Sequence, residues 1–324
     1  MTSLHYSYTR IASESVIRLA QDHYSLDGDL DCHFYVAGLH DNYILTSNFE
    51  QYIFRVYRNT WRSEIEIQFE LELVKFLNGK NASVTRLVPT INNKSCFRLE
   101  TSEGERFFAL FRYAEGNAPG KDLTAEESNL LGTVVAQMHL HADKFVPSVQ
   151  GQELDFSYLV DRSLGLIKPF LDDCDYDFLC ELREEIYPKL SGLDRSGSKY
   201  GICAGDINAN NFHINFDDRI TLFDFDQCGY GYRSFEIAKL FSSLYKHKKA
   251  SDIRASFLEG YQQIRRLDED ELAAIPLFEI VAVIWVMAIN AENAEYIGYK
   301  HLQSEYWDQK IVVLRELCLH IENT

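Results

Sequence analysis

Residues 200–233 read YGICAGDINANNFHINFDDRITLFDFDQCGYGYR, and the fold and chemistry of this 324-residue chain are decided there. Asp206 follows a glycine in a polar loop, and Asn211 comes five residues later. The segments 212–215 and 220–224 alternate apolar and polar residues on either side of a turn-rich segment, which predicts two short strands in a hairpin. This hairpin should return Asp224, at the end of its second strand, towards Asp206 and Asn211.

Two carboxylates and one amide are the groups that phosphoryl transfer from ATP requires. One carboxylate accepts the proton of the acceptor hydroxyl, while the other carboxylate and the amide oxygen hold Mg2+ on the phosphates. Mg2+ keeps several waters, so two protein ligands suffice. The alternative for Gly-Asp-x4-Asn alone is a loop with solvated acids, because so short a pattern recurs by chance. The segment Asp224-Phe225-Asp226 at the expected spacing favours the kinase interpretation.

Three motifs carry a resemblance to a known family: Gly205-Asp206-x4-Asn211, Leu222-Phe223-Asp224-Phe225-Asp226 and Gly229-Tyr230-Gly231. They resemble the aminoglycoside phosphotransferase–homoserine kinase–choline kinase superfamily, and most of all its branch of homoserine-kinase-like and stress-response kinase proteins. The resemblance implies an α+β, bilobal, protein-kinase-like fold, with a small antiparallel-sheet N-lobe that holds one main helix and with an α-rich C-lobe. It also implies O-phosphorylation that depends on ATP and Mg2+, with Asp206 as the catalytic base and Asn211 and Asp224 as metal ligands.

The sequence departs from the family pattern near the predicted base. Cys203-Ala204 stands where the family usually has His before Gly-Asp, and Asn208 stands where it often has His. Neither position takes the proton or holds the metal. Most eukaryotic-type protein kinases have a Lys two residues after the catalytic base, whereas this chain has none at that distance from Asp206. This difference favours the small-molecule side of the superfamily. Cys203 is either a reactive thiol or an ordinary packing residue, and we expect packing.

A second pair of residues matches the phosphate-binding half of a kinase. Arg55 lies in the predicted strand 51–57, and Ser63-x-x-Glu66 is a capping box that should begin the next helix. Glu70 lies in the middle of that helix. Arg55 and Glu70 therefore match the pair of strand cation and helix carboxylate that holds ATP phosphates in kinases. The alternative is that Arg55 points to solvent from an edge strand.

Three further residues are expected at the nucleotide site. The resemblance places the turn 38–42, which begins with Gly38, over the ATP phosphates, although a plain hairpin turn explains it equally well. Tyr113 and Glu115 stand at a Gly- and Pro-containing segment with the composition of a linker. The resemblance implies a hinge there that offers backbone groups to adenine, and we place the boundary near Glu115, between an N-lobe of residues 1–114 and a C-lobe of residues 115–324.

The remaining segments fill the two predicted lobes. Glu236 stands where the family usually has an Asp that braces the catalytic loop, and His139 and His141 are expected to be structural. We predict strands at 33–37, 43–46, 87–90, 94–99 and 106–113. We predict helices at 11–23, from the capping box Thr124-x-x-Glu127 onwards, two or three within 150–195, and at 253–265, 276–290 and 306–322. Ser13 should cap the first of these helices, and Pro276 should lie in a first helical turn.

Composition limits the partners of the protein. The net charge of −17 argues against nucleic acids and anionic membranes and is compatible with a cationic acceptor, although a merely acidic surface explains it too. The seven scattered cysteines show no metal-ligand spacing, so we expect reduced thiols and a cytoplasmic protein. The longest apolar stretch, Ile280–Ile289, is too short to span a membrane, and the N-terminus does not resemble a signal peptide.

The sequence thus predicts an ATP:alcohol phosphotransferase that acts on a small hydroxylated molecule, such as an aminoglycoside-like or homoserine-like compound. The alternatives are a Ser/Thr protein kinase of the stress-response type and a nucleotide-binding pseudokinase that serves as an interaction module. The pseudokinase is disfavoured because all three positions Asp206, Asn211 and Asp224 are filled. The identity of the acceptor, the choice between ATP and GTP, and the oligomeric state stay open.

Overall fold

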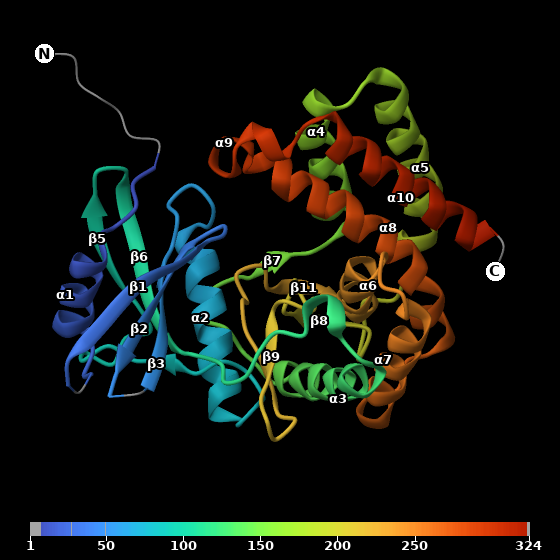
Figure 1. The fold of residues 1–324 in the computed structure, drawn as a ribbon. Coiled ribbons are helices and arrows are strands. Elements are labelled where there is room, and N and C mark those ends of the chain that lie inside the picture. Colours follow the sequence, from blue (N-terminus) through green and yellow to red (C-terminus); the bar gives the residue numbers. More distant parts are fainter. Residues whose placement is uncertain (1–7, 27, 49, 323–324) are drawn as a thin grey trace, which may run out of the picture. The chain divides into compact units, whose positions relative to one another are not determined.

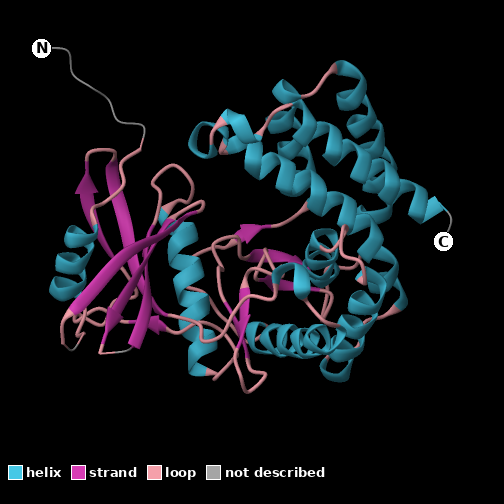
Figure 2. Cartoon of the chain, in the orientation of Figure 1, coloured by secondary structure: helices cyan, strands magenta, loops and turns pink. Residues whose placement is uncertain are grey.

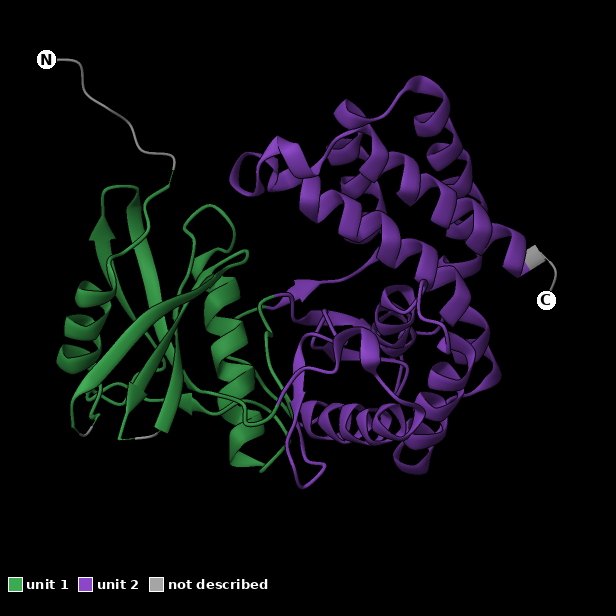
Figure 3. Cartoon of the chain, in the orientation of Figure 1, with its two compact units in different colours: residues 1–116, 145–150, 221–226 green, residues 117–144, 151–220, 227–324 purple. Residues whose placement is uncertain are grey.

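The computed structural model of the chain describes residues 8–26, 28–48 and 50–322. It divides the chain into two compact units (Figure 3). The first unit is made by the chain up to residue 116 together with 145–150 and 221–226, and the second by 117–144, 151–220 and the chain from 227 onwards. The short segment 221–226, which carries Asp224, therefore belongs to the first unit although its neighbours in sequence belong to the second.

The first unit is built on an antiparallel sheet. Its strand order is β1-β2-β3-β6-β4, and β5 pairs with β6. On the central strand β3, Arg55 lies opposite Asn42 of β2 and Ala109 of β6, so Arg55 is not on an edge strand. The strands are β1 (Leu30–Ala37), β2 (Asp41–Ser47), β3 (Glu50–Val56), β4 (Leu87–Val88), β5 (Phe97–Thr101) and β6 (Gly104–Arg112).

Two helices, α1 (Ser13–His23) and α2 (Glu64–Gly79), cover opposite faces of this sheet (Figure 1). Side chains alternate between the faces of a strand. On β3, Tyr52, Phe54 and Val56 join a hydrophobic core with Val16 and Ala20 of α1. Arg55 must then point to the other face, where α2 lies. A strand cation between core residues thus reaches a helix that carries a buried acid, Glu70.

The helix starts of the first unit test two of the predictions. The capping box at α2 is confirmed: the Glu66 N–H donates to the Ser63 hydroxyl over 3.3 Å, and the Ser63 N–H donates to the Glu66 carboxylate over 2.9 Å. The prediction that Ser13 caps the first helix is wrong. Ser13 is the first helical residue of α1, and the capping position is Ala12, which has no side-chain acceptor to offer.

The second unit is mainly helical (Figure 2). Its small sheet pairs β11 with β7 in parallel and with β8 in antiparallel. Since the first unit has the expected antiparallel sheet with one main helix and the second is rich in helices, the predicted fold class is confirmed. The elements are α3 (Ala125–Ala142), β7 (Gln152–Glu153), α4 (Arg162–Ile167), α5 (Asp173–Ser191), β8 (Tyr200–Cys203), β9 (Phe212–Ile214), β11 (Gly229–Tyr232), α6 (Arg233–Ser243), α7 (Ala250–Ile264), α8 (Glu269–Glu292), α9 (Ala294–Ile297) and α10 (Ser304–Glu322), with short 3-10 and π turns between them. Strand β10 (Ile220–Leu222) begins in the second unit, and its other two residues belong to the first.

Helix α8 corrects two expectations from the sequence. Asp268 forms a capping box with Glu271, so the helix begins at Glu269, and Pro276 lies inside it instead of in its first turn. The helix is also longer than the apolar stretch 280–289, and it is long and apolar enough to cross a membrane by length and composition. Its most apolar 18-residue window is 67% buried inside the protein, and a core helix passes the same test.

Candidate active site

The loop that follows β8 presents the predicted base. Gly205 has a φ of +87°, and a Cβ at this position would overlap the carbonyl oxygen of Gln227. Only glycine is compatible with both conditions. The next residue, Asp206, is therefore carried on a turn whose backbone is tightly determined.

Both oxygens of the Asp206 carboxylate have partners within the second unit. The side-chain amide of Asn211 donates to Oδ2 over 3.0 Å and to the Asp206 carbonyl over 2.9 Å. The Lys239 ammonium, on α6, donates to Oδ1. The Asp206 side chain is only 17% exposed and that of Lys239 only 7%. The structure thus brings Asp206 and Asn211 together, as predicted, and adds a buried lysine that the sequence analysis missed.

A buried carboxylate holds the base loop in place. Glu236 accepts hydrogen bonds from the backbone N–H groups of Ala204 (3.0 Å) and Gly205 (2.7 Å). Its Oε2 also lies 2.7 Å from His139 Nε2, and His139 Nδ1 lies 2.8 Å from the Tyr261 hydroxyl. Burial raises the pKa of Glu236 to about 7, and the two backbone N–H groups oppose this rise. This series of hydrogen bonds runs from Tyr261 through His139 and Glu236 to Gly205, and it fixes the turn that carries Asp206.

Cys203 lies beside this brace and is a packing residue. It is fully buried, and burial raises its pKa far above the usual range of a thiol. A thiolate is the reactive form of cysteine, so this position is inert. The ligand atoms of His139, Cys203 and Glu236 lie within 4.8 Å of one another. However, the Glu236 oxygens are already used by backbone N–H groups and the imidazole, so the trio acts as a structural brace.

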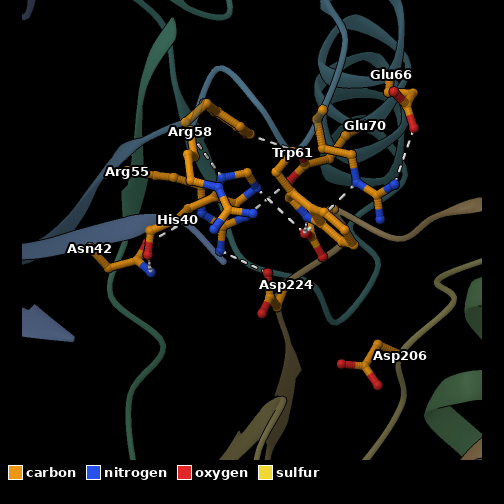
Figure 4. A network of polar contacts seen from close by, with 12 residues as sticks. His40, Asn42, Arg55, Arg58, Trp61, Glu66, Glu70, Asp206 and Asp224 are labelled. Carbon is orange, nitrogen blue, oxygen red and sulfur yellow. Dashed lines mark hydrogen bonds and ion pairs between the residues drawn. The ribbon is translucent and has the colours of Figure 1, made fainter. Parts of the chain in front are cut away.

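The first unit contains the predicted pair of Arg55 and Glu70 (Figure 4). The guanidinium donates from Nη1 to Glu70 Oε1 over 3.1 Å, from Nη2 to Asp224 Oδ1 over 2.9 Å, and from Nε to Asn42 Oδ1 over 3.3 Å. The Tyr57 hydroxyl donates to the other Glu70 oxygen over 3.0 Å. Burial raises the pKa of Glu70 to about 7, although Arg55 opposes the rise. Arg55 is thus a buried cation between two carboxylates.

Asp224 is held in an uncommon backbone conformation. Its φ is +65°, which non-glycine residues seldom adopt. The preceding Leu222 anchors the segment to the first unit, because its N–H donates to the Ser83 carbonyl over 2.9 Å and its carbonyl accepts from the Thr85 N–H over 2.8 Å. The structure describes Asp224 in the first unit, and Asp206 and Asn211 in the second. Their predicted convergence therefore stays a prediction.

Asp226 is a second carboxylate whose role the sequence analysis did not assign. It is buried, and it accepts a hydrogen bond from Trp61 Nε1 over 2.8 Å and lies 3.4 Å from His40 Nε2. Although burial opposes it, the bond to His40 and the charge of Arg62 hold the pKa of Asp226 well below its usual range. Burial lowers the pKa of His40 to about 4. Asp226 ties the segment that carries Asp224 to the turn between β1 and β2.

The structure describes three predicted nucleotide-site residues, Gly38, Tyr113 and Glu115, within the first unit. The Gly38 N–H donates to the His40 carbonyl over 3.0 Å, and a Cβ on Gly38 would find its nearest neighbour at 3.8 Å, so the turn does not require glycine. The Tyr113 N–H donates to the Gln51 carbonyl over 2.9 Å, and Glu115 is exposed. Their contribution to nucleotide binding stays a prediction.

The available donors fit a hard cation. In the described part of the chain, Asn211 uses its side-chain amide nitrogen for both of its side-chain hydrogen bonds, which leaves its side-chain oxygen available for a ligand. Carboxylate and amide oxygens are the ligands that Mg2+ takes in proteins. Asn211 of the second unit and Asp224 of the first unit thus have side chains of the right chemistry for a metal ion, and their role as its ligands stays a prediction.

The sequence matches the model of the phosphotransferase enzyme family over residues 35–275. The chain belongs to this family and is a phosphotransferase enzyme, so the family predicted from the motifs is confirmed. An uncharacterized protein of Synechocystis sp. is 33% identical over 96% of this chain and 86% of its own length.

Solved structures of kinases share the fold. A microcompartment-associated aminopropanol kinase has a TM-score of 0.79 at 18% identity, and the match covers 95% of this chain and 96% of that one. An amicoumacin kinase in complex with AMP-PNP, Ca2+ and Ami has a TM-score of 0.78 at 20% identity, over 97% of this chain and 94% of that one. These likenesses confirm the protein-kinase-like fold.

Proposed function

We propose that this enzyme transfers the γ-phosphoryl group of ATP to a hydroxyl of a small molecule in a reaction that requires Mg2+. The observation that carries the proposal is the Asp206 carboxylate, which Asn211 and Lys239 hold from two sides on a loop braced by Glu236. A fixed carboxylate of this kind aligns an acceptor hydroxyl and accepts its proton.

In the proposed reaction the acceptor oxygen forms a bond to the γ-phosphorus, and the bond from that phosphorus to the bridging oxygen breaks. ADP leaves with the electron pair of the broken bond, and the acceptor proton passes to an oxygen of Asp206. Arg55, oriented by Glu70, binds phosphate oxygens in a bidentate manner. Mg2+, bound by Asn211 and Asp224, would neutralise charge on the phosphates.

Related proteins support a nucleotide and a small acceptor. One structural neighbour was solved with the ATP analogue AMP-PNP, and both neighbours are kinases of small molecules, aminopropanol and amicoumacin. The absence of a Lys two residues after Asp206 also separates this chain from most eukaryotic-type protein kinases. We therefore favour a small-molecule acceptor over a protein.

The test of this proposal is Asp206→Asn. This variant keeps the shape of the side chain but cannot accept the proton, so we expect kcat to fall about a hundredfold or more. ADP release from ATP, measured over a panel of hydroxylated metabolites, gives kcat, and calorimetry should show nucleotide affinity close to that of the wild type. Near-normal turnover in Asp206→Asn would overturn the assignment of the base.

A further inference from the structure

Helix α6 presents two charged side chains to the loop that carries Asp206. Glu236 and Lys239 are three residues apart, so they lie on one face of this helix. Glu236 accepts hydrogen bonds from the backbone N–H groups of Ala204 (3.0 Å) and Gly205 (2.7 Å). The Lys239 ammonium donates to Oδ1 of the next residue, Asp206. One helix face therefore fixes the backbone of the loop and also brings a cation to its carboxylate.

The Lys239 ammonium can make more hydrogen bonds than it makes in the structure. An ammonium has three N–H donors. Among the residues that the structure describes, the Asp206 carboxylate is the only hydrogen-bond partner of this ammonium. Asn211 holds the same carboxylate at Oδ2 over 3.0 Å, so each oxygen of Asp206 has a donor from the protein. A carboxylate oxygen accepts more than one hydrogen bond. Both Lys239 and Asp206 can therefore contact a substrate while they stay paired.

Stability alone does not explain a cation at this position. The Lys239 side chain is only 7% exposed, and taking an ammonium and a carboxylate out of water costs free energy that a buried ion pair does not always return. Asn211 already holds Asp206 with a neutral amide, and a second neutral donor would hold it at a lower cost of desolvation. The positive charge of Lys239 thus suggests that this part of the site binds more negative charge than that of Asp206.

The proposed reaction moves negative charge from one neighbour of Lys239 to another. When the acceptor proton passes to Asp206, the ion pair loses its negative member. The new bond from the acceptor oxygen places the transferred phosphoryl group beside the same carboxylate. In the loose transition state of phosphoryl transfer, negative charge is spread over three equatorial oxygens of that group. The ammonium can then donate to one of these oxygens through an N–H group that Asp206 does not use.

We propose that Lys239 is a catalytic residue, whose ammonium binds the transferring phosphoryl group while Asp206 accepts the acceptor proton. This inference rests on the proposed function and adds a residue to its machinery. An acceptor hydroxyl must lie within about 3 Å of an Asp206 oxygen, and Lys239 contacts the same carboxylate. A phosphoryl group on this hydroxyl is therefore a neighbour of the ammonium. Because the interaction strengthens as charge develops, it lowers the barrier in addition to any effect on substrate binding.

Kinetics of Lys239 variants test the catalytic role. Lys239→Met should lower kcat about tenfold or more and leave the KM for ATP unchanged, because the interaction is made in the transition state. Lys239→Arg keeps the charge and should restore a large part of the rate. Lys248→Met is the control, since it removes an exposed lysine from the segment that follows α6. ADP release from ATP is measured with the panel of hydroxylated metabolites and with water alone, and an unchanged rate in Lys239→Met would overturn the inference.

A second experiment distinguishes contact with the phosphoryl group from mere orientation of Asp206. MgADP with fluoroaluminate mimics the transferring group, and calorimetry measures its binding without any acceptor. The comparison uses Asp206→Asn, in which the ion pair with Lys239 is already lost. In this background Lys239→Met should weaken binding of the fluoroaluminate complex about tenfold and leave binding of MgADP alone unchanged. Equal fluoroaluminate affinities of the single and double variants, whatever their value, or an equal loss of MgADP binding, would show that Lys239 does not bind the phosphoryl group.

These results separate the inference from the proposed function. If Asp206→Asn abolishes turnover while Lys239→Met keeps a normal rate, the phosphotransferase proposal stands and the role of Lys239 is wrong. If Asp206→Asn keeps normal turnover but Lys239→Met loses fluoroaluminate binding, the base assignment fails and the role of Lys239 stands.

Discussion

At the scale of single residues, Arg55 joins two parts of the predicted site, because it pairs both with Glu70 and with the predicted metal ligand Asp224. It is ion-paired with Glu70 at 3.1 Å and with Asp224 at 2.9 Å. The predicted phosphate-binding cation therefore forms an ion pair with a predicted metal ligand. Under the proposed function, Mg2+ and ATP phosphates would replace this ion pair, because each would bind one of its two members.

Replacement of Arg55 tests the phosphate-binding half of the site. Arg55→Ala should raise the KM for ATP about tenfold or more, equivalent to about 1.4 kcal/mol, and Arg55→Lys should retain partial activity. Glu70→Ala should have a smaller effect, because Glu70 orients Arg55 without touching the nucleotide. Steady-state kinetics with varied ATP give these values. An unchanged KM in Arg55→Ala, combined with a loss of stability, would make Arg55 a purely structural residue.

The two proposed metal ligands, Asn211 and Asp224, differ in charge, and this predicts unequal effects of their replacement. Asp224→Ala removes a charge and a ligand, whereas Asn211→Ala removes a neutral ligand only. Asp224→Ala should therefore weaken the Mg2+-dependent part of ATP binding more than Asn211→Ala does. Calorimetric titrations of ATP at several Mg2+ concentrations measure this part. Negligible effects of both changes would rule out a metal site at these residues.

The sequence predicted residues whose positions follow from local periodicity, and it missed those that depend on packing. Arg55 and Glu70 could be paired because strands and helices repeat regularly over the 15 residues that separate them. Lys239 lies 33 residues from Asp206, and only the packing of α6 brings the two together. Asp226 was visible in its motif, but its partners His40 and Trp61 lie far away in sequence.

At the scale of elements, the close contact of α3 and α7 depends on two glycines. A Cβ on Gly132 of α3 would overlap the carbonyl oxygen of Phe257 on α7, and a Cβ on Gly260 of α7 would overlap the carbonyl oxygen of Asn129 on α3. The Ser128 hydroxyl of α3 donates to the Ile253 carbonyl over 2.9 Å across the same contact. The two backbones thus touch without intervening side chains.

Gly260→Ala should destabilise the protein by about 1–3 kcal/mol, because the added methyl group forces the two helices apart. The matched control is Gly165→Ala on α4, where an added Cβ has no neighbour within 4 Å. That change should stabilise the protein by up to about 1 kcal/mol through helix propensity. Denaturant unfolding of both variants measures the difference. Equal stabilities would show that α3 and α7 separate at no cost.

The ends of elements were predictable only where the signal is local. The capping boxes at Ser63 and Thr124 were found because both partners lie within four residues. The start of α8 was misplaced at Pro276, although Asp268 and Glu271 form a capping box of the same kind. Proline is common in the first turn of a helix, so Pro276 suggested that a helix begins there. The structure shows that the residues before Pro276 are already helical.

At the scale of the whole molecule, burial raises the pKa of acidic side chains, whereas their ion pairs and hydrogen bonds lower it. Burial raises the pKa values of Glu70, Glu236 and Glu279 to about 7, although each has a cationic or N–H partner that lowers it. Glu70 and Glu236 belong to the candidate site. Glu279 lies outside it, on α8, where it accepts hydrogen bonds from Arg254 of α7 over 3.1 and 2.7 Å.

Glu279 therefore allows the effect of burial on stability to be measured without disturbing the site. Its pKa is about 7 in the folded protein and 4.5 as an ordinary side chain, so the folded state binds its proton more tightly. The stability that this group contributes is present below pH 4.5 and is lost as the pH rises towards 7. Buried histidines act in the opposite sense: burial lowers the pKa of His40 to about 4, so its contribution is lost as the pH falls.

A comparison with Glu279→Gln isolates the contribution of Glu279, because groups such as His40 titrate in both proteins and cancel in the difference. The unfolding free energy of the wild type, minus that of Glu279→Gln, should fall as the pH rises from about 4.5 to about 7 and should be constant above that range. The slope should not exceed about 1.4 kcal/mol per pH unit, the value for one proton. Glu181→Gln, an exposed position on α5, controls for the loss of one charge. Denaturant unfolding at a series of pH values tests the sign directly. If the difference rises with pH instead, the ion pair with Arg254 outweighs burial, and the carboxylate of Glu279 is more stable in the folded protein than in water.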